Sequence, residues 1–274
     1  MVNKVYGHSW EEAVQWLKKQ PDQQDLIKAA FYDDPLIDAA KRYAESSEWS
    51  AIQELLLNIE KGNVLDIGAG RGISSYALAK DGWKVTALEP DPSNIVGTGA
   101  IGLLAKESGL DIDVIETRGE GLPFTDGVFD LIYCRAALHH ANNLNALCKE
   151  VFRVLKPGGI FLATREHVIS KAEDLDKFLN AHPLHYLYGG EHAYLLKEYL
   201  SAIKTAGFKV EKVLAPVASD LNLYPQTKKE FKKHLASRLH IPNSLFPYFL
   251  LNLYAVFSNS PGRHYSFFAR KHNA

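Results

Sequence analysis

The fold is decided by the stretch from Val64 to Asp91, which reads VLDIGAGRGISSYALAKDGWKVTALEPD. Short apolar and β-branched runs at 63–67 and 84–88 flank a helical pattern at 73–80. A strand, a helix and a second strand in this order predict two strands of a parallel sheet joined by a helix. We therefore expect an α/β fold built around this unit.

An acid stands at each end of the glycine turn in this unit. Asp66 ends the first predicted strand and Glu89 ends the second, so both lie at the carboxyl ends of strands, where open α/β sheets bind ligands. Glu89 follows Gly68 by 21 residues, a separation at which a carboxylate accepts hydrogen bonds from both hydroxyls of a ribose. Asp66 would repel a pyrophosphate placed at the start of the helix. A ligand that combines a ribose with positive charge would suit both acids.

The chain continues this alternation of strands and helices. The turn LKPGG at 155–159 is predicted to be tight, with Gly158 at a position that needs positive φ. Together with the first two strands, the later strands give a Rossmann-like, doubly wound and mostly parallel seven-stranded sheet. The further predicted strands are 113–116, 129–134, 160–164, 208–214 and 265–270, and the further predicted helices are 94–106, 144–155 and 194–206.

Three segments lie outside the alternation. Residues 1–60 read as helical, with Trp10, Val14 and Leu17 at helical spacing, and are predicted to form an N-terminal helical lid. Residues 61–274 would form the ligand-binding domain. Its segments near 168–193 and 216–262 are rich in Pro, His and aromatic residues and are predicted to be insertions on the substrate side.

Five motifs follow one another in register: VLDIGAGRG at 64–72, ALEPD at 87–91, GEGLPF at 119–124, FDLIYCRAALHH at 129–140 and VFRVLKPGG at 151–159. Together they resemble class I S-adenosylmethionine-dependent methyltransferases, particularly the type 11 group. The resemblance implies strand order 3-2-1-4-5-7-6, S-adenosyl-L-methionine as cofactor and methyl transfer as the activity.

The resemblance also implies which residues bind the cofactor. The glycine turn would border its methionyl part, the acid of ALEPD its ribose, and the stretch from Gly119 its adenine. Arg118 stands where many relatives have an aspartate, so recognition of the adenine amine would fall to Glu120 or to the backbone. The expected cofactor-binding residues are Asp66, Gly68, Ala69, Gly70, Gly72, Glu89, Pro90, Gly119, Glu120 and Arg135.

His139 and His140 follow the fourth strand, on the face where a methyl acceptor should lie. A hydroxyl acceptor must lose a proton, whereas a neutral amine or a stabilised carbanion needs little help. Adjacent side chains point apart, so we expect at most one of the two histidines to act as the catalytic base. His167 is a further candidate, although its position predicts a surface histidine.

A metal site is not predicted. His182, His185, Glu191 and His192 stand close together in the sequence, but Pro183 and the pair at 189–190 break any helical face that would align them. Cys134 and Cys148 form no CxxC pair, so neither zinc nor a disulfide framework is indicated, and two buried free thiols suit the cytosol. The expected location is therefore cytoplasmic.

The composition of the chain limits the kinds of partner that it is expected to bind. A net charge of −1 and a pI of about 6.8 lack the basic excess of a nucleic-acid-binding domain, so no nucleic acid is expected. The longest apolar stretch, 245–257, is too short to span a bilayer, and no signal peptide is seen. A helix near 227–240 has an apolar stripe and four lysines, which allows peripheral contact with an anionic membrane. The sequence does not fix an oligomeric state.

The predicted acceptor is a small or lipid-like molecule. Phe31, Tyr32 and the aromatic residues of 245–257 would wall an apolar pocket for it, although core packing is the default for both groups. Two other functions stay open. A non-catalytic protein that binds S-adenosylmethionine fits the same residues, and an NAD-dependent oxidoreductase is disfavoured by the GxGxG spacing and by Asp66.

Overall fold

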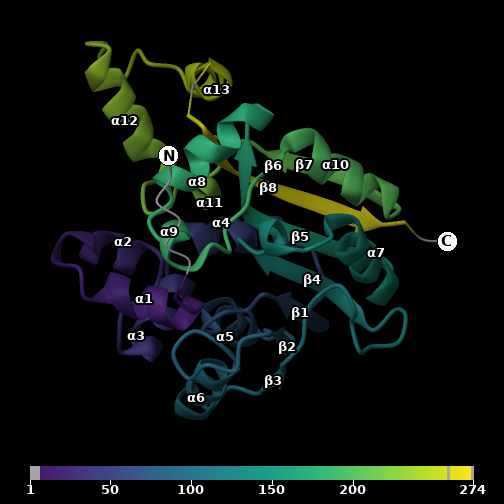
Figure 1. Cartoon of the computed structure of the whole chain (residues 1–274). Coiled ribbons are helices and arrows are strands. Elements are labelled where there is room, and N and C mark those ends of the chain that lie inside the picture. The colour runs from purple at the N-terminus through teal and green to yellow at the C-terminus, as the bar shows by residue number, and fades with distance from the viewer. Residues whose placement is uncertain (1–6, 258–259, 273–274) are drawn as a thin grey trace.

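The structure, a computed structural model, describes residues 7–257 and 260–272 and is built around one mixed sheet (Figure 1). Its strands follow the order β3-β2-β1-β4-β5-β8-β7, and the short β6 pairs with β5 outside this path. Without β6, this is the predicted order 3-2-1-4-5-7-6. The strands among the described residues are β1 Asn63–Ile67, β2 Lys84–Leu88, β3 Ile112–Ile115, β4 Phe129–Arg135, β5 Leu155–Ile169, β6 Tyr194–Leu195, β7 Phe208–Leu214 and β8 Gly262–Lys271.

The strands from β1 to β5 pair in parallel, and β8 runs antiparallel to β5 and β7. The helices are α1 Trp10–Lys18, α2 Gln24–Ala29, α3 Leu36–Ala44, α4 Ser47–Leu56, α5 Ile73–Lys80, α6 Thr98–Ser108, α7 Leu144–Val154, α8 Leu175–Ala181, α9 His185–Tyr188, α10 Leu196–Thr205, α11 Asp220–Leu223, α12 Lys228–Arg238 and α13 Phe249–Phe257, with 3₁₀ turns η1 Pro21–Gln23, η2 Leu138–His140 and η3 Ala172–Asp174.

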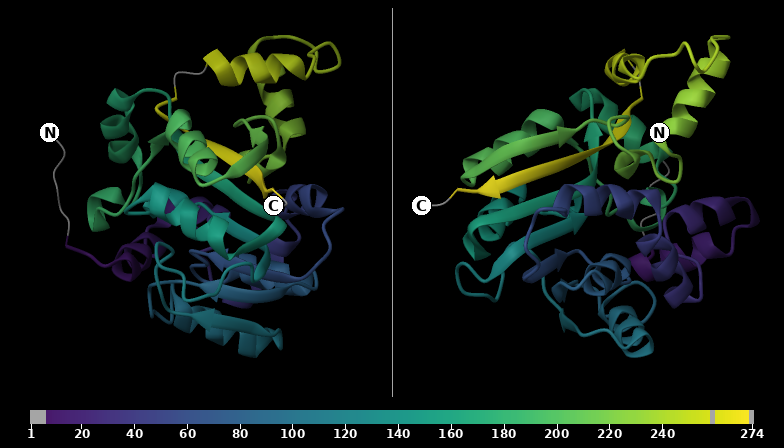
Figure 2. Two further views of the ribbon diagram at one scale, coloured as in Figure 1. Left: turned by 90° about the vertical axis from the view of Figure 1, so that its right-hand side faces the viewer. Right: turned by 180° about the vertical axis from the view of Figure 1, so that it is seen from behind.

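Each face of the sheet carries its own hydrophobic core, with helices on both sides (Figure 2). Successive side chains of a strand point to opposite faces, and β4 shows the consequence. Leu131 and Tyr133 pack with α3, α4 and α5, whereas Ile132 and Cys134 pack with α7 and α10. Such a strand is apolar at the positions that both cores bury, which explains the run of apolar residues at 131–134.

The LKPGG segment differs from its prediction. It belongs to β5, because Leu155 pairs with Phe129 and Ile160 pairs with Leu131. Residues 156–159 therefore form a bulge inside the sheet rather than a turn outside it. Gly158 has φ of 77°, so the expected need for positive φ is confirmed.

The N-terminal helices divide into two groups. Tyr43 on α3 and Trp49 on α4 are buried in the core of one sheet face. Val14 and Leu17 on α1 instead pack with Leu187 on α9, so α1 and the first insertion cover each other. Ser9 caps α1 through reciprocal bonds with Glu12. This capping explains why the helix begins at Trp10.

The two predicted insertions contain mostly short helices. The segment 168–193 holds α8 and α9, and 216–262 holds α11, α12 and α13. In Figure 1, α12 and α13 lie at the top, far from α5 and α6 at the bottom. Of the helices in the described residues, none combines the length and the apolar character needed to cross a bilayer.

Candidate active site

The glycine turn after β1 has a backbone that favours glycine at three positions. Gly68, Gly70 and Gly72 have φ of 67°, 54° and 83°. A Cβ on Gly68 would lie 2.6 Å from Ala137 Cβ, whereas a Cβ on Gly70 would meet nothing within 4 Å. Gly70 thus leaves backbone open beside the cavity described below. Gly72 packs toward Ile101 and begins α5.

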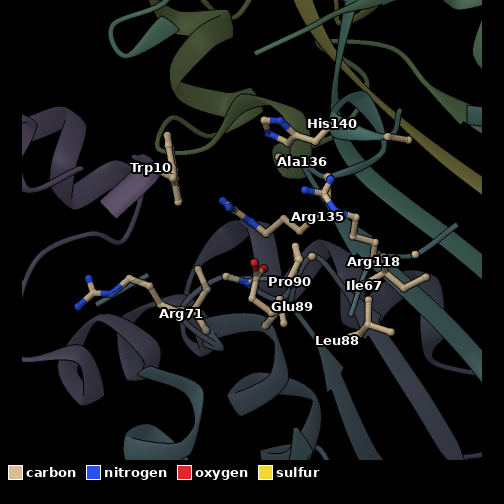
Figure 3. A pocket seen from close by; sticks show the side chains of 18 of the residues that line it. Trp10, Ile67, Arg71, Leu88, Glu89, Pro90, Arg118, Arg135, Ala136 and His140 are labelled. Atoms are coloured by element: carbon tan, nitrogen blue, oxygen red, sulfur yellow. Dashed lines mark hydrogen bonds between the residues drawn. The ribbon is translucent and has the colours of Figure 1, made fainter. Parts of the chain in front are cut away.

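The Glu89 side chain is fixed by the backbone of this turn. Its Oε2 accepts a hydrogen bond from the Gly70 amide at 2.9 Å, and its Oε1 accepts one from the Asp91 amide at 3.0 Å. Burial raises the pKa of Glu89 while these two amides lower it. The carboxylate is therefore held in one orientation at the end of β2, facing the cavity (Figure 3).

Asp66 lies behind the glycine turn and is fully buried. Its Oδ2 accepts hydrogen bonds from the hydroxyls of Ser74 at 2.7 Å and Ser75 at 2.6 Å. Its Oδ1 is buried and has no hydrogen-bond partner among the described residues. Burial raises the pKa of Asp66 to about 6, against the two serine hydroxyls and the charge of Arg135, which lower it.

A cavity of about 320 Å³ opens at the carboxyl ends of β1, β2 and β4. In Figure 3, Glu89 lies on one side of it, and Trp10 and His140 lie opposite. Three of the expected site residues, Asp66, Gly72 and His139, do not line it. Those that do are Gly68, Ala69, Gly70, Glu89, Pro90, Gly119, Glu120, Arg135 and His140.

Two arginines join the cavity to the N-terminal helices. Arg135 forms a bidentate ion pair with the buried Glu48 on α4, at 2.6 and 3.0 Å. Arg71 in the glycine turn donates to the backbone of Phe31 and Asp33 and to the carboxylate of Asp34. Sequence reasoning missed Glu48 because its partner is 87 positions away and nothing local marks the pair.

The side of the cavity expected to hold the adenine is formed by the loop before β4. Gly119 packs against Leu147 so closely that a Cβ there would lie 2.5 Å from a methyl carbon of Leu147. Glu120 accepts a hydrogen bond from the Asn142 amide at 2.8 Å, and Arg118 also lines the cavity. The acid and the arginine thus both belong to the cavity, and Glu120 is tied to the segment that follows His140.

His140 is exposed and lines the cavity. Its Nδ1 lies 3.0 Å from the Gly190 carbonyl oxygen. Because a carbonyl oxygen only accepts hydrogen bonds, Nδ1 must carry the proton of this bond. The neutral ring then keeps a lone pair on Nε2, which is the atom that accepts a proton in base catalysis.

His139 has a different environment. It is buried, and its Nδ1 lies 2.8 Å from Oε2 of the fully buried Glu166. The Glu166 carboxylate also accepts hydrogen bonds from the backbone amides of Ala137, Leu138 and His139. Burial lowers the pKa of His139, but the carboxylates of Glu166 and Glu191 raise it to about 9. The two adjacent histidines therefore differ in both contacts and exposure.

Two residues near the end of β5, Glu166 and His167, differ from what the sequence predicts. The prediction of a surface position for His167 was wrong, because its side chain is only 15% exposed. Glu166 was missed, although a signal existed. It is an acid two residues beyond Thr164, where the predicted strand ends and β5 stops pairing in parallel with β4, so its place resembles those that drew attention to Asp66 and Glu89.

Comparison with known proteins identifies the class. Residues 65–163 match the family model of the methyltransferase domain. The sarcosine/dimethylglycine N-methyltransferase of Halorhodospira halochloris is 34% identical over 146 residues, which is 52% of this chain and 50% of that protein. The chain spans about half the length of the curated relatives it matches.

Solved structures show the same fold over nearly the whole chain. A putative sarcosine dimethylglycine methyltransferase from Galdieria sulphuraria has a TM-score of 0.60 at 20% identity, covering 96% of this chain and 99% of that one. The geranyl diphosphate C-methyltransferase from Streptomyces coelicolor A3(2), in complex with Mg²⁺, geranyl diphosphate and S-adenosyl-L-homocysteine, has a TM-score of 0.59 at 15% identity, covering 95% and 97%.

The family match places a methyltransferase domain at residues 65–163, and the chain shares its fold with solved methyltransferase structures. A solved geranyl diphosphate methyltransferase with the same fold is in complex with S-adenosylmethionine.

Proposed function

We propose that this chain transfers the methyl group of S-adenosylmethionine to a small organic acceptor. The observation that carries the proposal is that Glu89, the open backbone at Gly70 and the free Nε2 of His140 all belong to one cavity. The first two suit the donor, and the third suits an acceptor that must lose a proton.

The residues present fit the donor. Glu89 is oriented to accept hydrogen bonds from a ribose, as its position after β2 predicts. The buried Asp66 Oδ1 retains an acceptor site beside the turn, which suits the positive charge of the methionyl part, directly or through water. Glu48 pairs with Arg135 and offsets a charge that would oppose a cation. When bound, the donor supplies a methyl group already activated by its sulfonium.

The acceptor would lie on the side of the cavity formed by His140 and aromatic residues. Trp10, Phe31, Tyr32 and Tyr188 line the cavity and give it apolar walls. Holding the acceptor close and aligned with the methyl group can supply much of the acceleration. His140 Nε2 would accept the acceptor proton, and the bond from Nδ1 to the Gly190 carbonyl would keep the ring oriented.

The names of similar proteins support a small acceptor. They include enzymes of sarcosine and dimethylglycine, of ubiquinone biosynthesis and of geranyl diphosphate. We propose in addition that α1 and α2 act as the lid over this site, since Trp10 lines the cavity and α1 packs on α9. The two buried free thiols support a reducing compartment such as the cytoplasm.

Calorimetric titration of the full chain with S-adenosylmethionine, S-adenosylhomocysteine and NAD tests the donor site. We expect binding of the first two, and a loss of at least tenfold in affinity for Glu89→Gln, because the amide accepts fewer hydrogen bonds and lacks the charge. Binding of NAD without binding of either adenosyl compound would overturn the proposal in favour of an oxidoreductase.

Transfer is tested with methyl-labelled donor and panels of hydroxyl, amine and carbon acceptors. With a hydroxyl acceptor, His140→Gln should lower turnover by about 10²–10⁴-fold and leave donor affinity unchanged. Donor binding without labelled product across all panels and a cell extract would favour a non-catalytic binding protein.

A further inference from the structure

Three side chains from three separate segments meet beside the cavity wall. His139 comes from η2, His167 from β5 and Glu191 from the end of the first insertion. His139 Nε2 lies 3.6 Å from Glu191 Oε2, and His167 Nδ1 lies 3.8 Å from the same oxygen. One ligand atom of each residue lies within 4.8 Å of the others.

These separations are too long for hydrogen bonds but suit a shared cation. Ligand atoms about 2.0–2.1 Å from a tetrahedral metal ion lie about 3.3–3.4 Å from one another. Among the described residues, Glu191 Oε2 and His167 Nδ1 are buried and have no hydrogen-bond partner. The Glu191 side chain is only 4% exposed, so this oxygen carries a desolvation cost that a bound ion would remove.

We propose that His139 Nε2, His167 Nδ1 and Glu191 Oε2 bind one divalent transition-metal ion. The surrounding residues are those that a metal site requires. Glu166 accepts the bond from His139 Nδ1, which fixes the ring and directs Nε2 toward the ion. Tyr188 donates its hydroxyl to Glu191 Oε1 and leaves Oε2 to face the histidines.

His182 is excluded as a fourth ligand by its own hydrogen bond. Its Nε2 lies 3.6 Å from Glu191 Oε1, but its Nδ1 accepts from the Leu184 amide. A neutral imidazole that accepts at Nδ1 carries its proton on Nε2. His182 therefore points a hydrogen toward Glu191, and the remaining coordination position is left to water.

The donor set selects the kind of metal. Two imidazoles and one carboxylate are typical of Zn²⁺ and of non-haem Fe²⁺. Mg²⁺ and Ca²⁺ prefer oxygen ligands throughout, so they are poor candidates. A divalent charge would also balance the two buried carboxylates, Glu166 and Glu191.

The alternative occupant is a proton on His139 between the two carboxylates. It would form an ion pair with Glu166 and Glu191, but it leaves His167 Nδ1 without a partner. The metal would satisfy all three atoms once one of the stacked rings of His139 and His167, whose centroids lie 4.2 Å apart at an interplanar angle of 25°, turns so that both lone pairs point at one ion. It would also order the cavity wall, because His140 adjoins His139 and is bonded to Gly190, which adjoins Glu191.

The test is metal loading of the full chain. After chelator treatment and desalting, the protein is incubated separately with Zn²⁺, anaerobic Fe²⁺, Mn²⁺ and Mg²⁺, and bound metal is measured by mass spectrometry. We expect about one Zn²⁺ or Fe²⁺ per chain with a raised melting temperature, and no retention of Mg²⁺. Failure of Zn²⁺, Fe²⁺ and Mn²⁺ alike to reach this ratio would overturn the proposal.

Loss of metal binding in single variants shows which side chains bind the ion. Glu191→Gln and His167→Gln should lose stoichiometric metal, and Glu166→Gln should bind it about 10–100-fold more weakly. His192→Ala is the matched control, because His192 is in the same segment but outside the cluster, and it should load as the wild type does. Full loading of both ligand variants would contradict the assignment. Where a variant fails to fold, X-ray absorption of the Zn²⁺-loaded wild type must show two imidazoles and no sulfur, and any other ligand set refutes the site.

Discussion

At the scale of single residues, Asp66 shows how burial prepares a charge for its ligand. A pKa near 6, against 3.8 for an ordinary aspartate, means that the folded protein holds a proton there more tightly than the unfolded chain does. This residue therefore lowers stability above pH 6, and its cost disappears as the pH falls from 6 towards 4. A cationic donor reverses the preference, because it interacts best with the ionised form.

Donor affinity should consequently depend on pH. We expect the dissociation constant for S-adenosylmethionine to rise by up to tenfold for each pH unit below about 6, because protonated Asp66 loses the attraction to the donor charge. Titrations between pH 5 and 7.5 measure the slope. In Asp66→Asn the slope should become shallower, with only the contribution of Glu89 left, whose pKa burial also raises. An identical slope in wild type and variant would contradict the role of Asp66.

At the scale of elements, glycine has two different roles in the turn between β1 and α5: close packing at one position and open space at another. Gly68 has both positive φ and a close neighbour, since a Cβ would lie 2.6 Å from Ala137 Cβ. Gly70 has positive φ but open space around it. The first position serves packing between this turn and the segment after β4, and the second serves access to the backbone.

Alanine at the two positions should therefore have different effects. Each variant places alanine at positive φ, which lowers the free energy of unfolding by about 1–2 kcal/mol. Gly68→Ala adds a clash that costs about 1–3 kcal/mol more in free energy of unfolding. Gly70→Ala should instead weaken donor binding, because its methyl group occupies the ligand side. Urea denaturation and donor titration of both variants check this pair, and equal losses of stability would disprove the distinction.

At the scale of the whole molecule, α12, α13 and the loop between them bring exposed apolar side chains and lysines together. Leu245 is 73% exposed and Phe249 is 61% exposed. Lys228 and Lys232 lie over the ring of Tyr248, so basic charge borders this apolar surface. Such a combination is typical of helices that lie on a lipid surface, and it would suit a lipid-like acceptor.

We expect the protein to co-sediment with vesicles of phosphatidylcholine and phosphatidylserine, and less with phosphatidylcholine alone. Charge reversal at Lys232 and Lys233 should remove about 1 kcal/mol of binding per lysine or more, and added salt should weaken it further. Lys106→Glu on α6, at the opposite end of the molecule, is the control. Equal sedimentation of all three proteins would argue against membrane contact.

Local patterns were enough to predict much of this structure. β1, α5, β2 and β7 have the predicted bounds, because apolar runs and glycine turns act within a few residues. Glu48 with Arg135 and His139 with His167 could not be predicted, since each pair joins segments brought together only by the folded sheet. Within residues 182–192, broken helical spacing predicts no metal site, but Glu191 meets histidines that come from β5 and η2. The predicted lid and the roles of the site residues stay predictions.

Arg71 links the glycine turn to the segment at residues 31–34. One guanidinium belongs to the turn that would hold the donor and bonds to the chain at residues 31–34. Any shift of that turn on ligand capture must be transmitted to the N-terminal segment, and any displacement of that segment must be felt at the turn. If the donor binds more tightly when the segment at residues 31–34 is packed against the turn, then by thermodynamic linkage the bound donor must stabilise that packing by the same free energy.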